Sequence, residues 1–337
     1  RWQEYPFALK AVGDKAFTEG INRMVIHRYA MQPHPDAAPA MTLGPWGIHF
    51  DRTNTWWEPG RAWIDYLNRC QTLLQEGLFV ADFAYFTGDN IVGYTKVHRR
   101  DLNPVPPEGY DYDLMNTETL LNRAWVERGR LRLPDGMNYR VLVLQEQSHI
   151  TLGLLRKLRN MVEQGLIIVG ARPQQTVGLQ SYSVIEEKEF EQLCDELWGK
   201  AATTVVDRSV GKGRIFWETS LNLEQVLEKI QLRPDFEVST DSISAPIRYI
   251  HRQIGESDVY FVANQQRTSK ELICNFRVKG KIPEFWNPIS GERTRAMVYQ
   301  TNEETISVPV QLEAYGSVFV VFRSDLPEQK AIRSIHK

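Results

Sequence analysis

The segment from Met24 to Trp63 concentrates side chains that can bind sugars. It holds three His, three Arg, four Trp and one Tyr, spaced by Gly and Pro residues that bend the chain. Indole and phenol rings can stack on the C–H faces of a sugar ring, while His, Arg and Asp can bind hydroxyl groups in fixed directions. We therefore predict a carbohydrate site in this segment. The alternative is a loop that tucks its tryptophans into a domain interface.

Carboxyl groups are the second requirement for sugar chemistry, because glycoside hydrolysis generally uses two of them on either side of the scissile bond. Asp51 and Glu58 lie in the candidate loop, but the sequence assigns neither as acid or base. Arg52 could instead simply neutralise Asp51. Three further carboxyl groups fall in helical patterns and are expected to face solvent: Asp14, Glu19 and Asp65.

The elements that position this loop form one α/β unit within residues 1–76. Residues 6–19 fit a helix ended by Gly20, residues 22–29 a strand, and residues 63–74 a second helix that stops at Gly77. In α/β barrels the loops after the strands carry the chemistry. His27 follows the strand, where it is either a core residue or part of a site. One unit cannot close a barrel, so we expect earlier units upstream of residue 1.

Residues 77–240 show strands alternating with helices, which predicts a doubly wound parallel sheet. The expected strands are 79–86, 140–144 and 166–170, and Thr151 is the expected N-cap of a helix. This pattern is similar to the class I glutamine amidotransferase shape, which needs a nucleophilic Cys at a strand-to-helix turn. Ser148 and His149 stand near that turn instead, and as sequence neighbours they are not expected to act as nucleophile and base. We expect a structural domain.

The last part of the chain changes to a period of two. Apolar alternation over 259–264, 272–278, 305–310 and 317–322 predicts an antiparallel β-sandwich across residues 241–325, followed by a flexible tail at 326–337.

Composition excludes several classes of function. The net charge of −2 arises from 40 basic and 42 acidic residues, which gives no electrostatic reason to expect nucleic acid, and no apolar run is long enough to span a membrane. Cys70, Cys194 and Cys274 are far apart and are expected to be buried, inert thiols. The His residues lack metal-ligand spacing, so no transition-metal site is predicted; carboxylate-bound calcium needs no such spacing.

The chain resembles the α-L-rhamnosidases of glycoside hydrolase family 106. The resemblance starts in Gly20–His27, continues through Met41–Arg52 and Thr55–Trp57, and extends in order over nearly the whole chain. Its later segments are 66–71, 80–82, 109–113, 133–137, 260–264, 276–278, 284–288 and 316–322.

The resemblance implies a fold, an activity and a location. The fold would be the C-terminal end of a (β/α)8 barrel at 1–76, an amidotransferase-like α/β domain without the catalytic Cys at 77–240, and the β-sandwich. Such enzymes invert the anomeric centre, use two glutamates, are associated with calcium, and are typically exported by bacteria, to the periplasm or outside the cell, to degrade rhamnose-containing polysaccharides. At least one catalytic Glu is expected upstream of residue 1, so this chain alone should be inactive. Sugar-contact roles carry over to His27, Trp46, His49, Arg52 and Trp57.

Two other readings stay open. One is a β-galactosidase-type barrel hydrolase, which also carries an amidotransferase-like domain behind its barrel. The other is a non-catalytic carbohydrate-binding or scaffold module.

Overall fold

The computed structural model describes residues 3–38, 41–42, 44, 46–88, 98–145, 148–177, 184–200, 205–218, 222–239 and 246–326. The chain divides into two compact units. Unit 1 joins residues 1–79 to residues 236–337, and unit 2 comprises residues 80–235. The predicted division into domains at 76, 240 and 325 concerns the architecture of the whole protein and stays a prediction.

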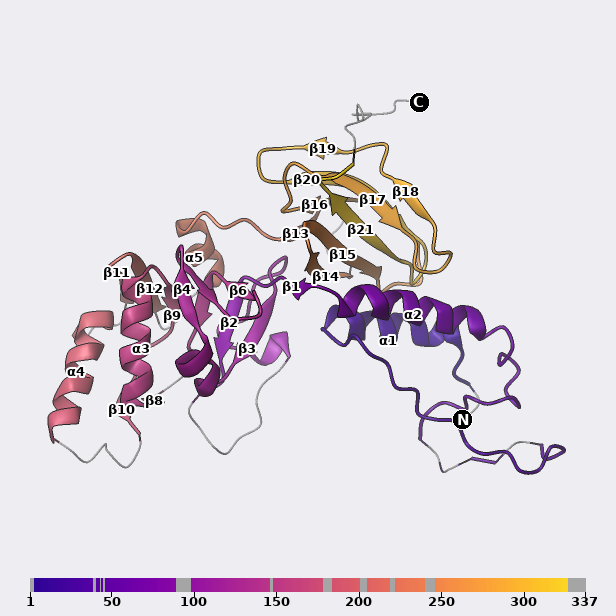
Figure 1. Ribbon diagram of the computed structural model, residues 1–337, viewed down its shortest axis with the longest axis horizontal. Helices are drawn as coiled ribbons and strands as arrows, with labels where there is room; N and C mark the ends of the chain where they lie inside the picture. Colours follow the sequence, from indigo (N-terminus) through magenta and orange to yellow (C-terminus); the bar gives the residue numbers. More distant parts are fainter. Residues whose placement is uncertain are drawn as a thin grey trace. The chain divides into compact units, whose positions relative to one another are not determined.

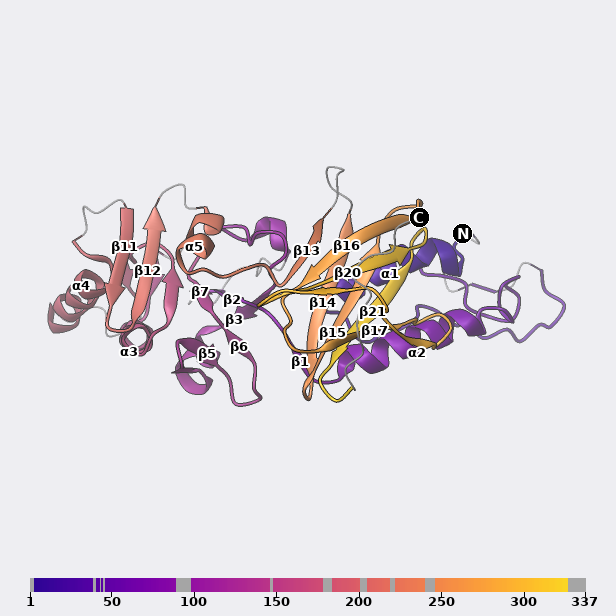
Figure 2. The ribbon, with the colours of Figure 1, turned by 90° about the horizontal axis from the view of Figure 1, so that it is seen from above.

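Among its described residues unit 1 contains two sheets and two helices, which are drawn in Figures 1 and 2. The first sheet has the order β1-β14-β15-β21-β17-β18 and the second the order β13-β16-β20-β19, and every pairing in both is antiparallel. The elements of unit 1 are α1 (Pro6–Thr18), α2 (Arg61–Gln75), β1 (Leu78–Phe79), β13 (Phe236–Ser239), β14 (Ile247–Ile254), β15 (Ser257–Asn264), β16 (Lys270–Phe276), β17 (Ile282–Trp286), β18 (Arg293–Arg295), β19 (Gln300–Thr301), β20 (Ile306–Leu312) and β21 (Ser317–Arg323).

The alternating residues of these strands build two cores, one on each face of the first sheet. Between the sheets, Tyr260, Val320 and Phe322 pack against Phe276 and Val308 of the second sheet. On the other face, Val259, Phe261, Phe319 and Val321 pack against Phe17 of α1 and Leu67, Cys70 and Leu74 of α2. The predicted sandwich is therefore present, with both N-terminal helices covering one of its sheets (Figure 1).

The two N-terminal helices end as the sequence predicts, but not all apolar residues of α1 are buried. Gly20, at φ +95°, lets the Ile21 amide reach the Ala16 carbonyl at 3.0 Å, which closes α1. Phe17 is buried, whereas Phe7 and Val12, two other apolar residues of the same helix, are exposed. The strand expected over 22–29 does not form, because among the described residues no neighbouring strand pairs with this segment.

Unit 2 is built on a six-stranded sheet of order β11-β12-β9-β7-β2-β3, in which only β11 runs antiparallel to its neighbour. Its elements are β2 (Phe83–Phe86), η1 (Arg99–Asp101), β3 (Tyr112–Met115), η2 (Thr119–Arg123), β4 (Trp125–Glu127), β5 (Arg130–Arg132), β6 (Asn138–Tyr139), β7 (Val141–Val143), β8 (His149–Ile150), α3 (Leu152–Glu163), β9 (Ile167–Val169), β10 (Gln175–Thr176), α4 (Val184–Trp198), β11 (Val205–Val210), β12 (Gly213–Glu218) and α5 (Leu223–Lys229).

The parallel core of unit 2 confirms the predicted strand–helix alternation. One face of the sheet, formed by residues such as Phe83, Val141 and Val169, packs on Val226 and Leu227 of α5. Thr151 caps α3 as predicted, since its Oγ1 accepts the Leu154 amide at 3.4 Å. The single strand expected at 79–86 is in fact two, with β1 in unit 1 and β2 in unit 2.

No helix in the described part of the chain is long and apolar enough to cross a bilayer. The predicted flexible tail, apart from residue 326, lies outside the described residues.

Candidate functional site

The candidate loop is organised by short backbone pairing. The amide of Arg28 donates to the Ile48 carbonyl at 3.1 Å, and the amide of Ile48 donates to the His27 carbonyl at 2.8 Å. Gly47 makes this pairing possible, because a Cβ built there would lie 2.1 Å from the His27 carbonyl oxygen and 2.4 Å from its Nδ1. Gly47 also has φ +78°, a conformation that favours glycine.

Gln32 fixes the two sides of the Pro-rich turn. Its Nε2 donates to the Met41 carbonyl at 2.9 Å, and its Oε1 accepts the Met41 amide at 3.0 Å. The same Nε2 lies 3.4 Å from Asp51 Oδ2. Gln32 was not among the predicted site residues. A side chain that bonds to distant backbone leaves no pattern in the sequence, and only its position within the candidate loop could have indicated it.

Aromatic rings form a second layer of the loop. The Phe50 ring lies 4.9 Å from Trp57, 5.9 Å from Trp56 and 6.5 Å from Trp63, measured between ring centroids. Tyr29 lies 6.2 Å from Trp57. These geometries are tilted or edge-to-face, as aromatic pairs prefer. The indole of Trp57 is therefore held by neighbouring rings while part of it stays accessible.

The five predicted sugar-contact residues differ in exposure. His27, Arg52 and Trp46 are exposed, with Trp46 at 74%, and Trp57 is half-buried. His49 is only 8% exposed, and its carbonyl accepts the Asn54 side-chain amide at 2.7 Å.

The backbone pairing brings His27 against the Gly47 turn that follows Trp46, and Trp57 lies beside Tyr29, two residues from His27. Arg52 is held at the Pro-rich turn, where its guanidinium donates to the Gln32 carbonyl at 3.3 Å.

The two candidate carboxyl groups of the loop, Asp51 and Glu58, differ in burial. Asp51 is buried, and its Oδ1 accepts the Thr53 amide at 2.8 Å and the Thr53 hydroxyl. These bonds, and not an ion pair with Arg52, satisfy the carboxylate among the described residues. Glu58 is exposed. Asp51 thus stabilises the loop, which leaves Glu58 as the accessible carboxyl group of the two.

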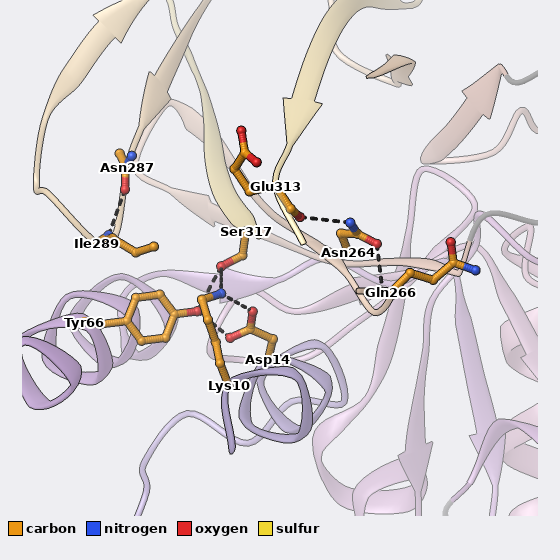
Figure 3. Close-up of polar contacts among 9 residues, drawn as sticks. All are labelled: Lys10, Asp14, Tyr66, Asn264, Gln266, Asn287, Ile289, Glu313 and Ser317. Atoms are coloured by element: carbon orange, nitrogen blue, oxygen red, sulfur yellow. Dashed lines mark hydrogen bonds and ion pairs between the residues drawn. The ribbon is translucent and has the colours of Figure 1, made fainter. Parts of the chain in front are cut away.

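The expectation that Asp14 faces solvent is wrong. Its side chain is fully buried between α1, α2 and β21, where Lys10 Nζ lies 2.6 Å from Asp14 Oδ2 and 2.7 Å from Ser317 Oγ (Figure 3). The hydroxyl of Tyr66 donates to Asp14 Oδ1 and lies 2.9 Å from Ser317 Oγ. We call Lys10, Asp14, Tyr66 and Ser317 the buried polar cluster.

Burial dominates the electrostatics of this cluster. It raises the pKa of Asp14, against the opposing effect of the Lys10 charge, and it raises the pKa of Tyr66 well above its usual value. The cluster joins the helices on both sides of the loop, since α1 precedes it and α2 follows it. It therefore fixes the two ends between which the candidate site is held.

The other reactive side chains that the structure describes are the cysteines and the pair Ser148 and His149. Cys70, Cys194 and Cys274 are buried as predicted, and burial raises the pKa of each thiol to about 12. Ser148 Oγ does lie 2.6 Å from His149 Nδ1, contrary to the expectation for sequence neighbours, but both side chains are exposed. The described residues contain no group of three or more His, Cys, Asp or Glu that could hold a metal.

Comparisons with known proteins give a consistent family. The model of a family described as α-L-rhamnosidase, glycoside hydrolase family 106, matches residues 1–301. A curated protein of Formosa agariphila, named "Putative beta-glucuronidase", is 35% identical over 334 residues, which are 99% of this chain and 27% of that protein.

Two solved structures of glycoside hydrolases are also similar to the chain. A rhamnosidase from Novosphingobium sp. PP1Y matches with a TM-score of 0.87 and 32% identity, over 100% of this chain and 31% of that one. A GH42 β-galactosidase from G. stearothermophilus matches with a TM-score of 0.56 and 12% identity, over 95% of this chain and 51% of that one, which shows a shared fold. The chain thus spans about a third or less of the curated relative and of the rhamnosidase.

Proposed function

Because the chain belongs to the α-L-rhamnosidases of glycoside hydrolase family 106, we propose that the whole protein hydrolyses terminal α-L-rhamnosides with inversion. The observation that carries this proposal for the present residues is the loop that exposes His27, Trp46 and Arg52 and holds Trp57 against Phe50. An inverting reaction needs a general acid at the leaving oxygen and a general base that activates water on the opposite face of the sugar.

Each loop residue has a proposed role in holding the sugar. The C6 methyl of rhamnose is apolar, so an indole wall made by Trp46 or Trp57 suits it. His27 and Arg52 would bind ring hydroxyls, since both present N–H donors at the surface. His49, with its low exposure, would lie at the bottom of the site.

The catalytic pair is proposed to include a Glu upstream of residue 1. Asp51 is engaged by Thr53 and Gln32, so it is better suited to holding the loop than to proton transfer. Calcium, which the family resemblance implies, finds no cluster of His, Cys, Asp and Glu ligands among the described residues, and no step proposed for this chain depends on it. We also propose, from the same resemblance, a secreted or periplasmic location in a bacterium.

A different sugar is the main alternative. The fold shared with a β-galactosidase favours no substrate, but the name of the Formosa agariphila relative points to a uronic acid, for which exposed Arg52 could provide a counter-charge. A panel of aryl rhamnoside, galactoside and glucuronide given to the longer protein separates these cases. Faster hydrolysis of the glucuronide than of the rhamnoside would overturn the proposed specificity.

The sugar-contact role is tested by calorimetry with rhamnose. Trp57→Ala removes the braced indole, and we expect several-fold weaker binding, because stacking on one ring is worth about 0.5–1.5 kcal/mol beyond the area it buries. Trp125→Ala is the matched control, since Trp125 is a partly exposed indole in unit 2. Equal rhamnose affinity in the two variants would refute the role of the loop.

A further inference from the structure

A small pocket lies at one end of the β-sandwich in unit 1. It has a volume of about 330 Å³ and is formed by the β17–β18 hairpin, β20 and β21. Its floor is apolar and contains Phe285, Val310 and Val318, of which Val310 is buried. Its rim is polar and exposed, with Asn287, Glu292 and Gln311. None of these residues belongs to the loop from Met24 to Trp63.

The rim is held in place before any ligand arrives. Asn287 Oδ1 accepts the amides of Ile289 at 2.8 Å and Ser290 at 3.2 Å, which holds its side chain against the turn that follows it (Figure 3). From α2, the Arg69 guanidinium donates to the carbonyls of Pro288 at 3.1 Å and Ile289 at 2.8 Å. A rim that is already ordered loses little conformational entropy on binding.

We propose that this pocket binds one neutral pyranose ring. An apolar floor that includes an aromatic side chain receives the C–H face of a sugar, and amide and carboxylate groups at the rim bind its hydroxyls. Among the described lining residues Glu292 is charged and none is Lys or Arg, so a uronate or phosphate would meet a carboxylate at the rim. Because about 330 Å³ is near the lower limit for ligand pockets, one ring fits better than an oligosaccharide.

The 337-residue chain with labelled valine methyl groups tests this by NMR. Methyl α-L-rhamnoside and methyl galactoside should shift the methyl resonances of Val310 and Val318, and glucuronate should bind at least tenfold more weakly. Glu292→Gln should remove most of that discrimination, because the repelling charge is gone. Unchanged valine resonances at saturating concentrations of the neutral glycosides, or glucuronate binding as tight as theirs, would overturn the proposal.

Matched variants locate the binding. Gln311→Ala removes an exposed rim amide and should weaken neutral glycosides several-fold, whereas Gln300→Ala on neighbouring β19, also exposed and outside the lining, should not. Trp57→Ala should leave the ligand-induced shifts of the valine methyl groups intact. A failure of the proposed loop site can therefore be told apart from a failure of this pocket. Equal affinities for Gln311→Ala and Gln300→Ala, or loss of the shifts with Trp57→Ala, would refute the assignment.

Discussion

At the scale of single residues, the buried polar cluster ties α1 and α2 to β21. Asp14 occupies a helix position whose sequence neighbours include Lys10 and Glu19, a pattern typical of a solvated face. Its burial is explained by partners that are distant in the sequence. Tyr66 bonds to Asp14 across 52 residues, and Ser317 bonds to Lys10 across 307 residues. Buried charges need such partners, because an unpaired carboxylate in an apolar interior is costly.

Tyr66→Phe should therefore destabilise the packing of α1 and α2 on the first sheet. Loss of the hydroxyl leaves Asp14 and Ser317 with fewer bonds, at a cost of about 1–3 kcal/mol. Hydrogen exchange of the α1 and α2 amides should become faster. Tyr5→Phe is the control, because Tyr5 is exposed. If the two variants exchange alike, the cluster contributes little to stability.

Asp111 gives a prediction about pH within unit 2. Burial raises the pKa of Asp111 to about 7, nearby Asp235 and Asp82 act in the same direction, and Arg99 opposes them. A raised pKa means that the folded state favours the protonated carboxyl. The resulting stabilisation is complete below the ordinary pKa of 3.8 and is lost as the pH rises through about 7.

Asp111→Asn mimics the protonated form. Relative to the variant, the natural chain should lose up to roughly 4 kcal/mol of unit 2 stability between about pH 4 and about pH 8. Hydrogen exchange of β2 and β3, compared between the two proteins at each pH, measures this. Asp135→Asn, at an exposed position, should show no such trend. A stability difference that is the same at both ends of the range would contradict the assigned titration.

At the scale of elements, the candidate loop depends on close approach between two chain segments. The His27 carbonyl is so near to Gly47 that no side chain fits between them. The pairing of 27–28 with 48–50 replaces the ladder that the extended segment lacks.

Gly47→Ala should displace the loop and weaken rhamnose binding at least tenfold, because the added methyl group collides with backbone and φ +78° is strained for alanine. Gly13→Ala is the matched control. Gly13 lies within α1 with nothing within 4 Å of the added Cβ, so this change should be neutral or mildly stabilising. Calorimetry measures the rhamnose affinity of both variants. Undiminished binding by Gly47→Ala would show that rhamnose binding does not depend on this close approach.

Local signals in the sequence were sufficient for most elements. Gly20 and Thr151 marked helix ends correctly, and the switch to a period of two marked the antiparallel strands. Non-local contacts could not be predicted. The split of 79–86 into β1 and β2 depends on which sheet each half joins, and the burial of His49, Asp51 and Asp14 depends on partners that no periodicity reveals. The sugar-contact role of Trp46 came from the family resemblance and stays a prediction, and its indole is exposed.

At the scale of the molecule, the chain matches its relatives over about a third or less of their length. In the candidate loop Asp36 and Glu58 are exposed and Asp51 is buried, and one of the two catalytic groups is proposed to be a Glu upstream of residue 1.

The 337-residue chain should accordingly release no rhamnose from an aryl rhamnoside, while the longer protein does. Release of the aryl group, followed by absorbance, compares the two at equal concentration. Turnover by the shorter chain at a rate near that of the longer protein would show that both catalytic groups lie within these residues.

The order of synthesis follows from the way unit 1 is assembled from residues 1–79 and 236–337. When a ribosome has completed unit 2, α1 and α2 still lack β14, β15 and β21, the strands that cover Phe17 and Cys70. Unit 2 can fold while it emerges, but the helices that frame the candidate loop must wait, with their apolar faces uncovered, for more than 150 further residues. During that interval the nascent chain is most exposed to aggregation and has the greatest need of a chaperone.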